Sequence, residues 1–165
     1  SDLSALRHAA SWLTPLAVTG NIRDTMYKTV LIPVSGKNGL ARAKAALTHA
    51  RRLSCGEIVL LHVFEPLPQI VGGEAHAELL AERKATGQTL LNTVMADCDL
   101  TGKQVRCRVD EGTTAETIIR VAHEENAELI IMFTDGRDGL QDMLLGSVTE
   151  RVLRNTDTAL LVIRR

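Results

Sequence analysis

Residues 128–163 read ELIIMFTDGRDGLQDMLLGSVTERVLRNTDTALLVI, and this stretch decides the fold. Residues 128–133 are almost continuously apolar, which is typical of a strand that is buried on both faces. A glycine-containing loop follows, then a helix from about Val148 to Arg154, then the apolar strand Ala159 to Ile163. A strand, a helix and a second strand in this order predict a β-α-β unit of a parallel sheet.

The same alternation extends back along the chain to residue 29. Strand-like runs cover residues 29–34, 57–64 and 104–109, and the last of these alternates polar and apolar residues as an edge strand does. Helical patterns lie between the strands, at residues 41–53, 74–97 and 113–125. The sequence therefore predicts an α/β domain whose parallel sheet is covered by helices.

The first 25 residues have a different character. Small and apolar residues recur there at helical spacing, at Leu3, Leu6, Ala10, Leu13 and Ala17. We expect an amphipathic helical extension and linker over residues 1–25 and the main domain over residues 26–165. The extension either packs on this domain or a dimer mate, or it connects to a neighbouring domain of a larger protein.

Composition excludes several classes of protein. The chain has 165 residues, 45% of them hydrophobic and 24% charged, which is an ordinary globular mixture. A formal net charge of −1 and an aromatic content of 2% argue against a nucleic-acid partner. No apolar run approaches the roughly 18 residues of a transmembrane helix, so we expect no membrane insertion. Three cysteines without C-x-x-C spacing indicate reduced thiols and a cytoplasmic location.

The chain offers little catalytic chemistry. Its five histidines are scattered without metal-ligand spacing, and His62 in a strand is interpreted as a core residue. There is no Gly-x-Ser-x-Gly nucleophile motif. We therefore expect no catalytic or metal-binding residues, and a slow ATPase or nucleotidyl transferase is the weakest of the functional hypotheses.

The loop before the last helix is the best candidate for a binding site. Gly136 and Gly139 allow a ligand to approach the main chain, and Gly146-Ser147 begins a helix whose amides and dipole suit phosphate. In parallel sheets ligands collect at the carboxyl ends of strands, which points to the loops after Val34 and Phe133. The alternative is that Ser147 and Glu150 form a capping box that needs no ligand, as we also expect for Thr113 and Glu116.

From residue 26 onward the chain resembles the universal stress protein family. The segments YKTVLIPVSG (27–36), EIVLLHV (57–63) and EGTTAETI (111–118) resemble its first strand, second strand and third helix start. Residues 135–165 resemble its closing signature, which in ATP-binding members reads Gly, two residues, Gly, nine residues, Gly and Ser or Thr. Gly136, nine residues and Gly146-Ser147 match the second part. The resemblance implies a five-stranded parallel sheet with helices on both faces, Rossmann-like and of the adenine nucleotide alpha hydrolase type.

Two positions depart from the pattern of the family's ATP binders. Ser35 stands where they usually carry Asp, and Phe133 stands where they carry Gly. The phosphate end of the site is thus retained, while the nucleoside end is altered. Carried over by position, the resemblance implies a nucleotide site made of Pro33, Ser35, Val63, Met132, Phe133, Gly136, Gly139, Gly146, Ser147, Val148 and Thr149.

The expected function is therefore regulatory. The resemblance implies a dimer that binds ATP with Mg, ADP, AMP or a related small phosphorylated ligand, weakly or with altered selectivity. The apolar strand Ala159 to Ile163 would pair with its own copy in a second subunit, which removes an exposed edge. The alternative is a nucleotide-free dimerisation or interaction domain, including the cytosolic regulatory part of a larger protein such as a transporter.

Overall fold

The computed structural model alternates strands and helices along the chain. It describes residues 27–35, 39–53, 55–68, 72–101, 103–134 and 146–164, so the extension expected over residues 1–25 lies outside the described residues. Within them the order is β1 (Thr29–Pro33), α1 (Gly39–Arg52), β2 (Glu57–Phe64), α2 (Gly73–Asp97), β3 (Gln104–Glu111), α3 (Thr114–Glu124), β4 (Leu129–Thr134), α4 (Ser147–Asn155) and β5 (Ala159–Arg164).

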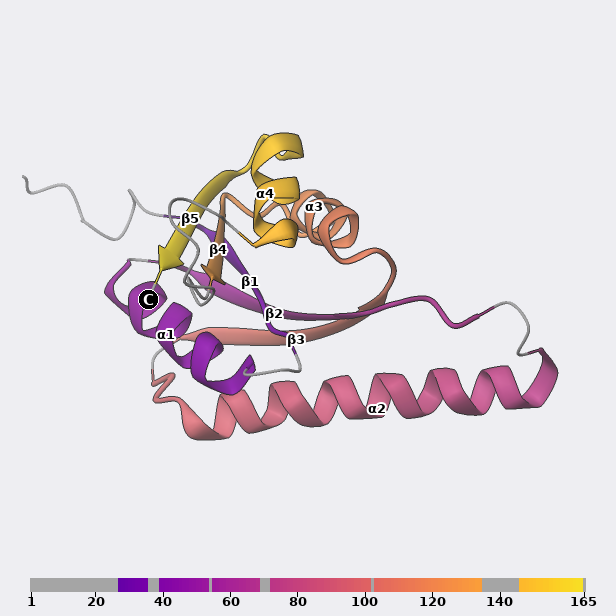
Figure 1. The fold of residues 1–165 in the computed structure, drawn as a ribbon. Coiled ribbons are helices and arrows are strands. Elements are labelled where there is room, and N and C mark those ends of the chain that lie inside the picture. Colours follow the sequence, from indigo (N-terminus) through magenta and orange to yellow (C-terminus); the bar gives the residue numbers. More distant parts are fainter. Residues whose placement is uncertain are drawn as a thin grey trace, which may run out of the picture.

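The five strands form one parallel sheet in the order β3-β2-β1-β4-β5 (Figure 1). β1 lies at the centre, where Val30 is in register with Ile58 of β2 and Leu129 of β4. The predicted edge position of β3 is confirmed, and β5 forms the opposite edge. The α/β class and the parallel sheet predicted from the sequence are both confirmed.

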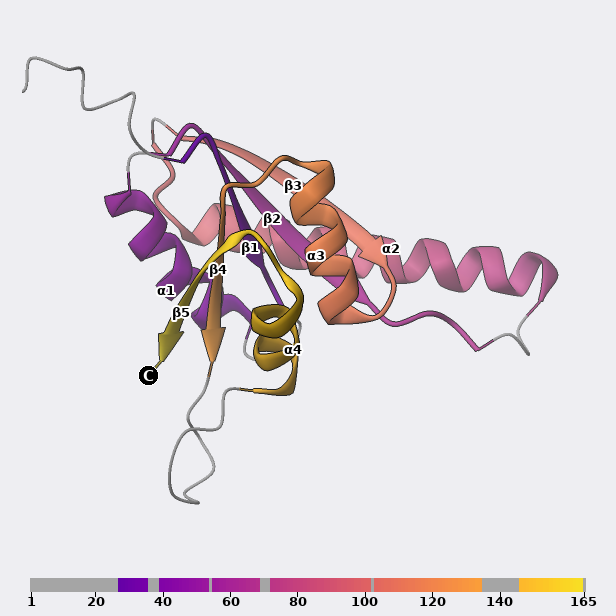
Figure 2. The ribbon, with the colours of Figure 1, turned by 90° about the horizontal axis from the view of Figure 1, so that it is seen from above.

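Alternate side chains of the central strands pack on opposite faces of the sheet. Val30 and Ile32 belong to the core beneath α1 and α2, whereas Leu31 belongs to the core beneath α3 and α4. All three side chains are fully buried. Figure 2 shows α3 and α4 over the near face of the sheet, with α1 and α2 behind it. Both faces are therefore covered, which explains why these strands are almost continuously apolar.

Both predicted capping boxes are wrong. Thr113 is the N-cap of α3, but its side chain makes no capping hydrogen bond, and the Glu116 carboxylate lies 3.6 Å from Nη1 of Arg151 in α4. α4 begins one residue earlier than expected, so Gly146 is its N-cap and Ser147 is already helical. The Glu150 carboxylate instead accepts a hydrogen bond from Arg154 at 2.8 Å. In both cases the carboxylate that a capping box would use is paired with an arginine instead.

The turn from β3 into α3 requires glycine at position 112. Gly112 has a φ of +151°, and a Cβ there would lie 2.3 Å from Oγ1 of the buried Thr117. Its amide donates to the carbonyl oxygen of Phe64 at 3.0 Å, which ties the turn to the end of β2. The start of α3 is thereby fixed beside the carboxyl ends of the strands.

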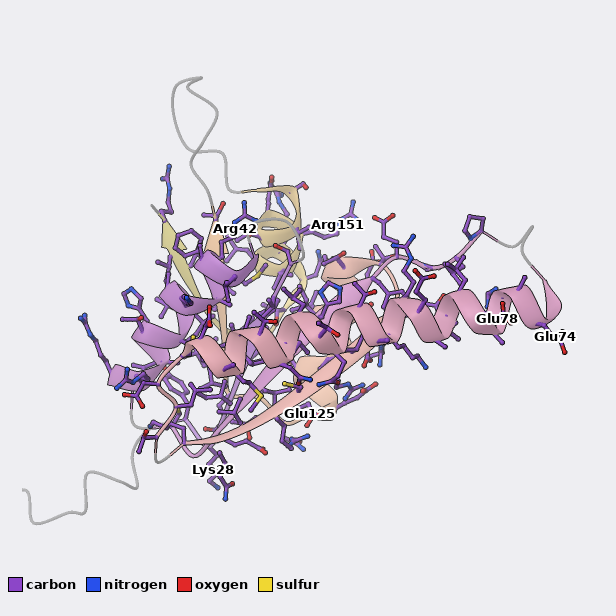
Figure 3. The ribbon with its side chains drawn as sticks, turned by 90° about the horizontal axis from the view of Figure 1, so that it is seen from below. Lys28, Arg42, Glu74, Glu78, Glu125 and Arg151 are labelled. Atoms are coloured by element: carbon purple, nitrogen blue, oxygen red, sulfur yellow. The ribbon has the colours of Figure 1, made fainter. Side chains whose placement is uncertain are left out.

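The first half of α2 extends beyond the sheet. The buried residues of this 25-residue helix are Gly87, Leu91 and Val94, all in its second half. Figure 3 shows Glu74 and Glu78 at the far end of the projecting part, away from the sheet. Burial against β2 and β3 thus fixes the second half of α2.

Candidate functional site

The sheet has a topological switch point between β1 and β4. The chain leaves β1 for α1 on one face of the sheet and leaves β4 toward α4 on the other face. Because β1 and β4 are neighbours and the helices that follow them pack on opposite faces, the carboxyl ends of these two strands mark the switch point. Ligands of doubly wound α/β proteins bind at this position.

A pocket of about 270 Å³ lies at this switch point. Strand ends form its floor, and residues from the starts of α1, α3 and α4 form its walls. The lining is mainly apolar, with two hydroxyl groups and one guanidinium among the described residues. The lining residues are Pro33, Val34, Ser35, Arg42, Leu61, Val63, Thr114, Ile118, Met132, Phe133 and Val148.

Six of the residues predicted from the sequence line this one pocket, namely Pro33, Ser35, Val63, Met132, Phe133 and Val148. Gly146, Ser147 and Thr149 lie at the start of α4, next to Val148 but not in the lining. Thr149 is 4% exposed, so its side chain belongs to the packed interior. Gly136 and Gly139 fall outside the described residues.

Five lining residues were missed by the sequence reasoning: Val34, Arg42, Leu61, Thr114 and Ile118. Val34, Leu61 and Ile118 are buried apolar residues that look like any other core position. Arg42 left one signal, because it lies in the first turn of the helix that follows the first loop. Its significance depends on packing that a single sequence does not display.

Two contacts with β2, one from a main-chain amide and one from a side chain, hold the end of β1 in place. The amide of Val34 donates to the carbonyl oxygen of Leu61 at 2.7 Å, and Nδ1 of His62 lies 2.9 Å from the carbonyl oxygen of Val34. His62 is half-buried and uses its ring to anchor this turn, in agreement with its interpretation as a structural residue. The wall that carries Ser35 is therefore preorganised.

The start of α4 supplies main-chain amides beside the pocket. The amide of Glu150 donates to the carbonyl oxygen of Gly146 at 2.9 Å, which is the first hydrogen bond of the helix. The amides of residues 147–149 precede that bond and lie at the positive end of the helix dipole. The amide of Gly146 itself donates to Oγ1 of the buried Thr134 at 3.4 Å, which joins the helix start to the end of β4.

One cation lies in the pocket wall. Nη1 of Arg42 donates to Oγ of Ser35 at 3.5 Å, a long hydrogen bond, and the Nε atom of Arg42 is shielded from solvent. Among the described residues that line the pocket, Arg42 is the single ionisable side chain. The pocket thus combines an apolar interior with a positive charge at its α1 side.

The other groups that could carry chemistry either lie outside the pocket or have low reactivity. Across the described part of the chain, no cluster of His, Cys, Asp and Glu is arranged to hold a metal ion. The three cysteines are free thiols, and burial raises the pKa of Cys98 and of Cys107 above the ordinary thiol value. A raised pKa disfavours the nucleophilic thiolate.

None of the helices described is long and apolar enough to cross a bilayer.

The sheet order and the pocket at its switch point define a doubly wound α/β domain with a cavity at the carboxyl ends of its central strands. A family model described as "Universal stress protein family" matches residues 26–164. The chain therefore belongs to the universal stress protein family.

Individual relatives agree with this assignment. Universal stress protein MJ0531 of Methanocaldococcus jannaschii is 32% identical over 145 residues, which cover 86% of this chain and 85% of that protein. The solved structure of protein MJ0577, from the same organism, is 28% identical with a TM-score of 0.68 and covers 85% of this chain and 97% of its own. A universal stress protein solved in complex with cAMP shares the fold, with 18% identity and a TM-score of 0.55 over 85% of this chain and 98% of its own.

Proposed function

We propose that this chain is a regulatory domain that binds an adenine nucleotide in the switch-point pocket. The base and ribose occupy the apolar interior, and the phosphates lie against the start of α4. The observation that carries this proposal is that the ends of β1 and β4 and the first turn of α4 meet around one cavity. The complex of a structural neighbour with cAMP, an adenine nucleotide, supports the ligand class.

The dimensions of the pocket suit part of a nucleotide. Its volume of about 270 Å³ lies just below the roughly 300–1,000 Å³ typical of small-molecule sites. It therefore holds a nucleoside-sized group and leaves the phosphates outside, where the amides of residues 147–149 can donate to them. Magnesium would enter with ATP as the counterion of its phosphates.

Two side chains weaken or redirect nucleotide binding. Phe133 lines the pocket with a half-buried ring and takes space that a smaller residue would leave open. Ser35 supplies a hydroxyl group without charge. Losing one polar contact costs about 1 kcal/mol, or roughly sixfold in affinity. We infer weak binding of ATP, with selectivity that depends on the altered nucleoside end.

The second candidate function is a nucleotide-free dimerisation domain, and the ring of Phe133 in the pocket favours it. In both cases we propose a homodimer formed through residues 159–163. β5 is an edge strand, and Leu161 on it is 36% exposed although apolar. We further propose a cytoplasmic location, a domain beginning at residue 26 and an N-terminal extension that either packs on this domain or a dimer mate or connects it to a larger protein.

Titration calorimetry of the whole chain with ATP, ADP and AMP tests nucleotide binding. Phe133→Ala is the informative variant, because it enlarges the pocket at the nucleoside end and should tighten ATP binding severalfold. Val105→Ala on β3 is the matched control, because it also truncates a strand side chain but lies outside the pocket lining. Absence of heat at millimolar nucleotide for both wild type and Phe133→Ala would reject nucleotide binding and leave the dimerisation domain.

A further inference from the structure

Thr114 contributes a hydroxyl group to the lining of the pocket. It is the first residue of α3, and its side chain is half-buried. Among the described residues, nothing forms a hydrogen bond with this hydroxyl, and Thr113 before it is the N-cap of the helix. The other two polar side chains of the lining differ, because Arg42 donates to Oγ of Ser35. The Thr114 hydroxyl is therefore available to a ligand that enters the pocket.

Contacts on both sides of Thr114 hold it beside the carboxyl end of β2. The amide of Gly112, in the turn before α3, donates to the carbonyl oxygen of Phe64 at 3.0 Å, and Phe64 is the last residue of β2. Ile118, one helical turn after Thr114, packs in the same core as Val63 of β2, and both line the pocket. Thr114 thus belongs to the β2 end of the pocket.

The proposed phosphate position lies at the other end of the pocket. The start of α4 is joined to the end of β4 by the hydrogen bond from the Gly146 amide to Oγ1 of Thr134, at 3.4 Å. β1 lies between β2 and β4 in the sheet. Neighbouring strands are about 4.8 Å apart, so roughly 10 Å separates the ends of β2 and β4. This separation is comparable with the length of a nucleoside, so a nucleotide with its phosphates at α4 brings its base to Thr114.

The base needs a polar partner at this end of the pocket. The amino group on carbon 6 of adenine lies at the end of the base away from the ribose, and burying it without a hydrogen bond is costly. The described lining residues nearby, Leu61, Val63 and Ile118, have apolar side chains. A threonine hydroxyl can accept a hydrogen bond from an amino group. A few well-placed polar groups in an otherwise apolar pocket are what give such sites their specificity.

We propose that Thr114 is a specificity-determining residue whose hydroxyl accepts a hydrogen bond from the amino group on carbon 6 of the base. The pocket then prefers nucleotides of 6-aminopurines to those of purines without this group. This inference rests on the proposed binding of adenine nucleotides and names the substrate class of that site. It gives α3 a role in the choice of base, whereas α4 supplies the contact with phosphate.

Calorimetry of the whole chain with adenosine 5′-monophosphate and purine riboside 5′-monophosphate, which lacks the amino group, tests the inference. The wild type should bind the adenosine ligand about three- to tenfold more tightly, the value of one neutral hydrogen bond. Thr114→Val, which keeps the size of the side chain without its hydroxyl, should reduce this ratio to about one. Thr114→Ser should restore it, because the hydroxyl returns.

Thr113→Val is the matched control for Thr114→Val. Thr113 is the exposed preceding residue, its side chain makes no capping hydrogen bond, and it lies outside the pocket lining. The same substitution there should leave the ratio of the two affinities unchanged. Thermal melting of both variants should show a stability close to that of the wild type, since threonine and valine have similar shapes and helix propensities.

The possible failures are distinguishable. Equal wild-type affinities for the two ligands would overturn the role of Thr114, while binding of adenosine 5′-monophosphate would still uphold the proposed function. A preference for the amino group that persists in Thr114→Val, or an equal loss of affinity for both ligands in that variant, would also overturn the inference. Failure of both ligands to bind the wild type would reject the proposed function and the inference together.

Discussion

Gly87 of α2 lies directly against the ring of His62 on β2. A Cβ atom at position 87 would fall 2.7 Å from Cδ2 of His62 and 2.8 Å from Cγ1 of Val109. Neither neighbour can move freely, because the His62 ring contacts the Val34 carbonyl oxygen at 2.9 Å and valine is stiff at χ1. The absence of a side chain at position 87 is what allows α2 to approach the sheet.

Gly87→Ala should therefore lower the free energy of unfolding, although alanine is the better helix former. Overpacking costs about 1–3 kcal/mol, whereas the gain in helix propensity is about 1 kcal/mol. We expect a net loss of about 1 kcal/mol, measured as a lower urea midpoint. Thr86→Ala, at the exposed preceding position, controls for helix propensity, and a Gly87→Ala protein more stable than the wild type would contradict the prediction.

Gly146→Ala should separate ligand binding from stability. A Cβ at position 146 would lie 3.6 Å from Oγ1 of Thr134, which is an ordinary contact, and loss of a glycine N-cap costs at most about 1 kcal/mol. The added methyl group lies beside the amides that we propose bind phosphate, so nucleotide affinity should fall severalfold.

Gly56→Ala is the opposite control for the Gly146 variant. Its Cβ would lie 2.9 Å from the carbonyl oxygen of Lys28, so it should destabilise the fold. It lies outside the pocket lining and should leave the affinity of the folded protein unchanged. Calorimetry with ATP together with thermal melting distinguishes the two, and full affinity in Gly146→Ala would argue against phosphate at the start of α4.

The acids of the β3 surface should make stability depend on pH in the acidic range. Arg108 donates to both carboxylate oxygens of Asp110 at 2.8 Å, and these bonds hold the pKa of Asp110 below its usual value. Hydrogen bonds from Arg106, and then from Arg108, lower the pKa of Glu125 in the same way. A pKa that is lower in the folded state gives stability that is complete above the unfolded pKa and is lost as the pH falls through the folded value.

We therefore expect the free energy of unfolding to decline below about pH 4, near the unfolded pKa values of these acids. Asp110→Asn should reduce that decline and should cost on the order of 1 kcal/mol at neutral pH, because it removes charged hydrogen-bond acceptors. Glu78→Gln, at an exposed carboxylate on the projecting end of α2, is the control. Urea unfolding at a series of pH values measures both effects. If Asp110→Asn lost stability below about pH 4 as steeply as the wild type, Asp110 would not be a source of the pH dependence.

Leu161→Lys should abolish the proposed homodimer. The side chain is apolar and 36% exposed on the edge strand β5, so a charge there should oppose pairing with a second copy. Size-exclusion chromatography with light scattering should show a dimeric wild type and a monomeric variant. Gln104→Lys adds the same charge on the exposed start of β3 and should remain dimeric. A monomeric wild type at high concentration would reject the dimer.

The sequence was sufficient for the parts of this molecule that depend on local patterns. Residues such as Val59 and Ile130 lie in continuous apolar runs because the sheet is covered on both faces, and such runs identify buried parallel strands. The order of strands and helices then placed the candidate site at the ends of β1 and β4. Six of the candidate residues meet there, whereas Gly136 and Gly139 lie outside the described residues.

The features that escaped prediction depend on contacts between distant segments. Glu116 and Glu150 fit a capping pattern, but Arg151 and Arg154 lie close enough to engage them instead. The position of Arg42 in the pocket wall follows from how α1 packs on the sheet, which its own helix pattern does not specify. These are tertiary effects, and one sequence alone carries no record of them.

The two margins of the sheet differ in charge, and under the proposed pairing this difference limits how large an assembly can grow. The β3 margin carries Arg106, Arg108 and Asp110, all engaged in ion pairs, while the β5 margin is apolar apart from its last residue. Under the proposed pairing, each chain has one apolar edge, and that edge is fully paired once a single partner has bound. Association then stops at two copies, and the charged borders that remain outermost discourage the endless strand-by-strand stacking that produces fibres.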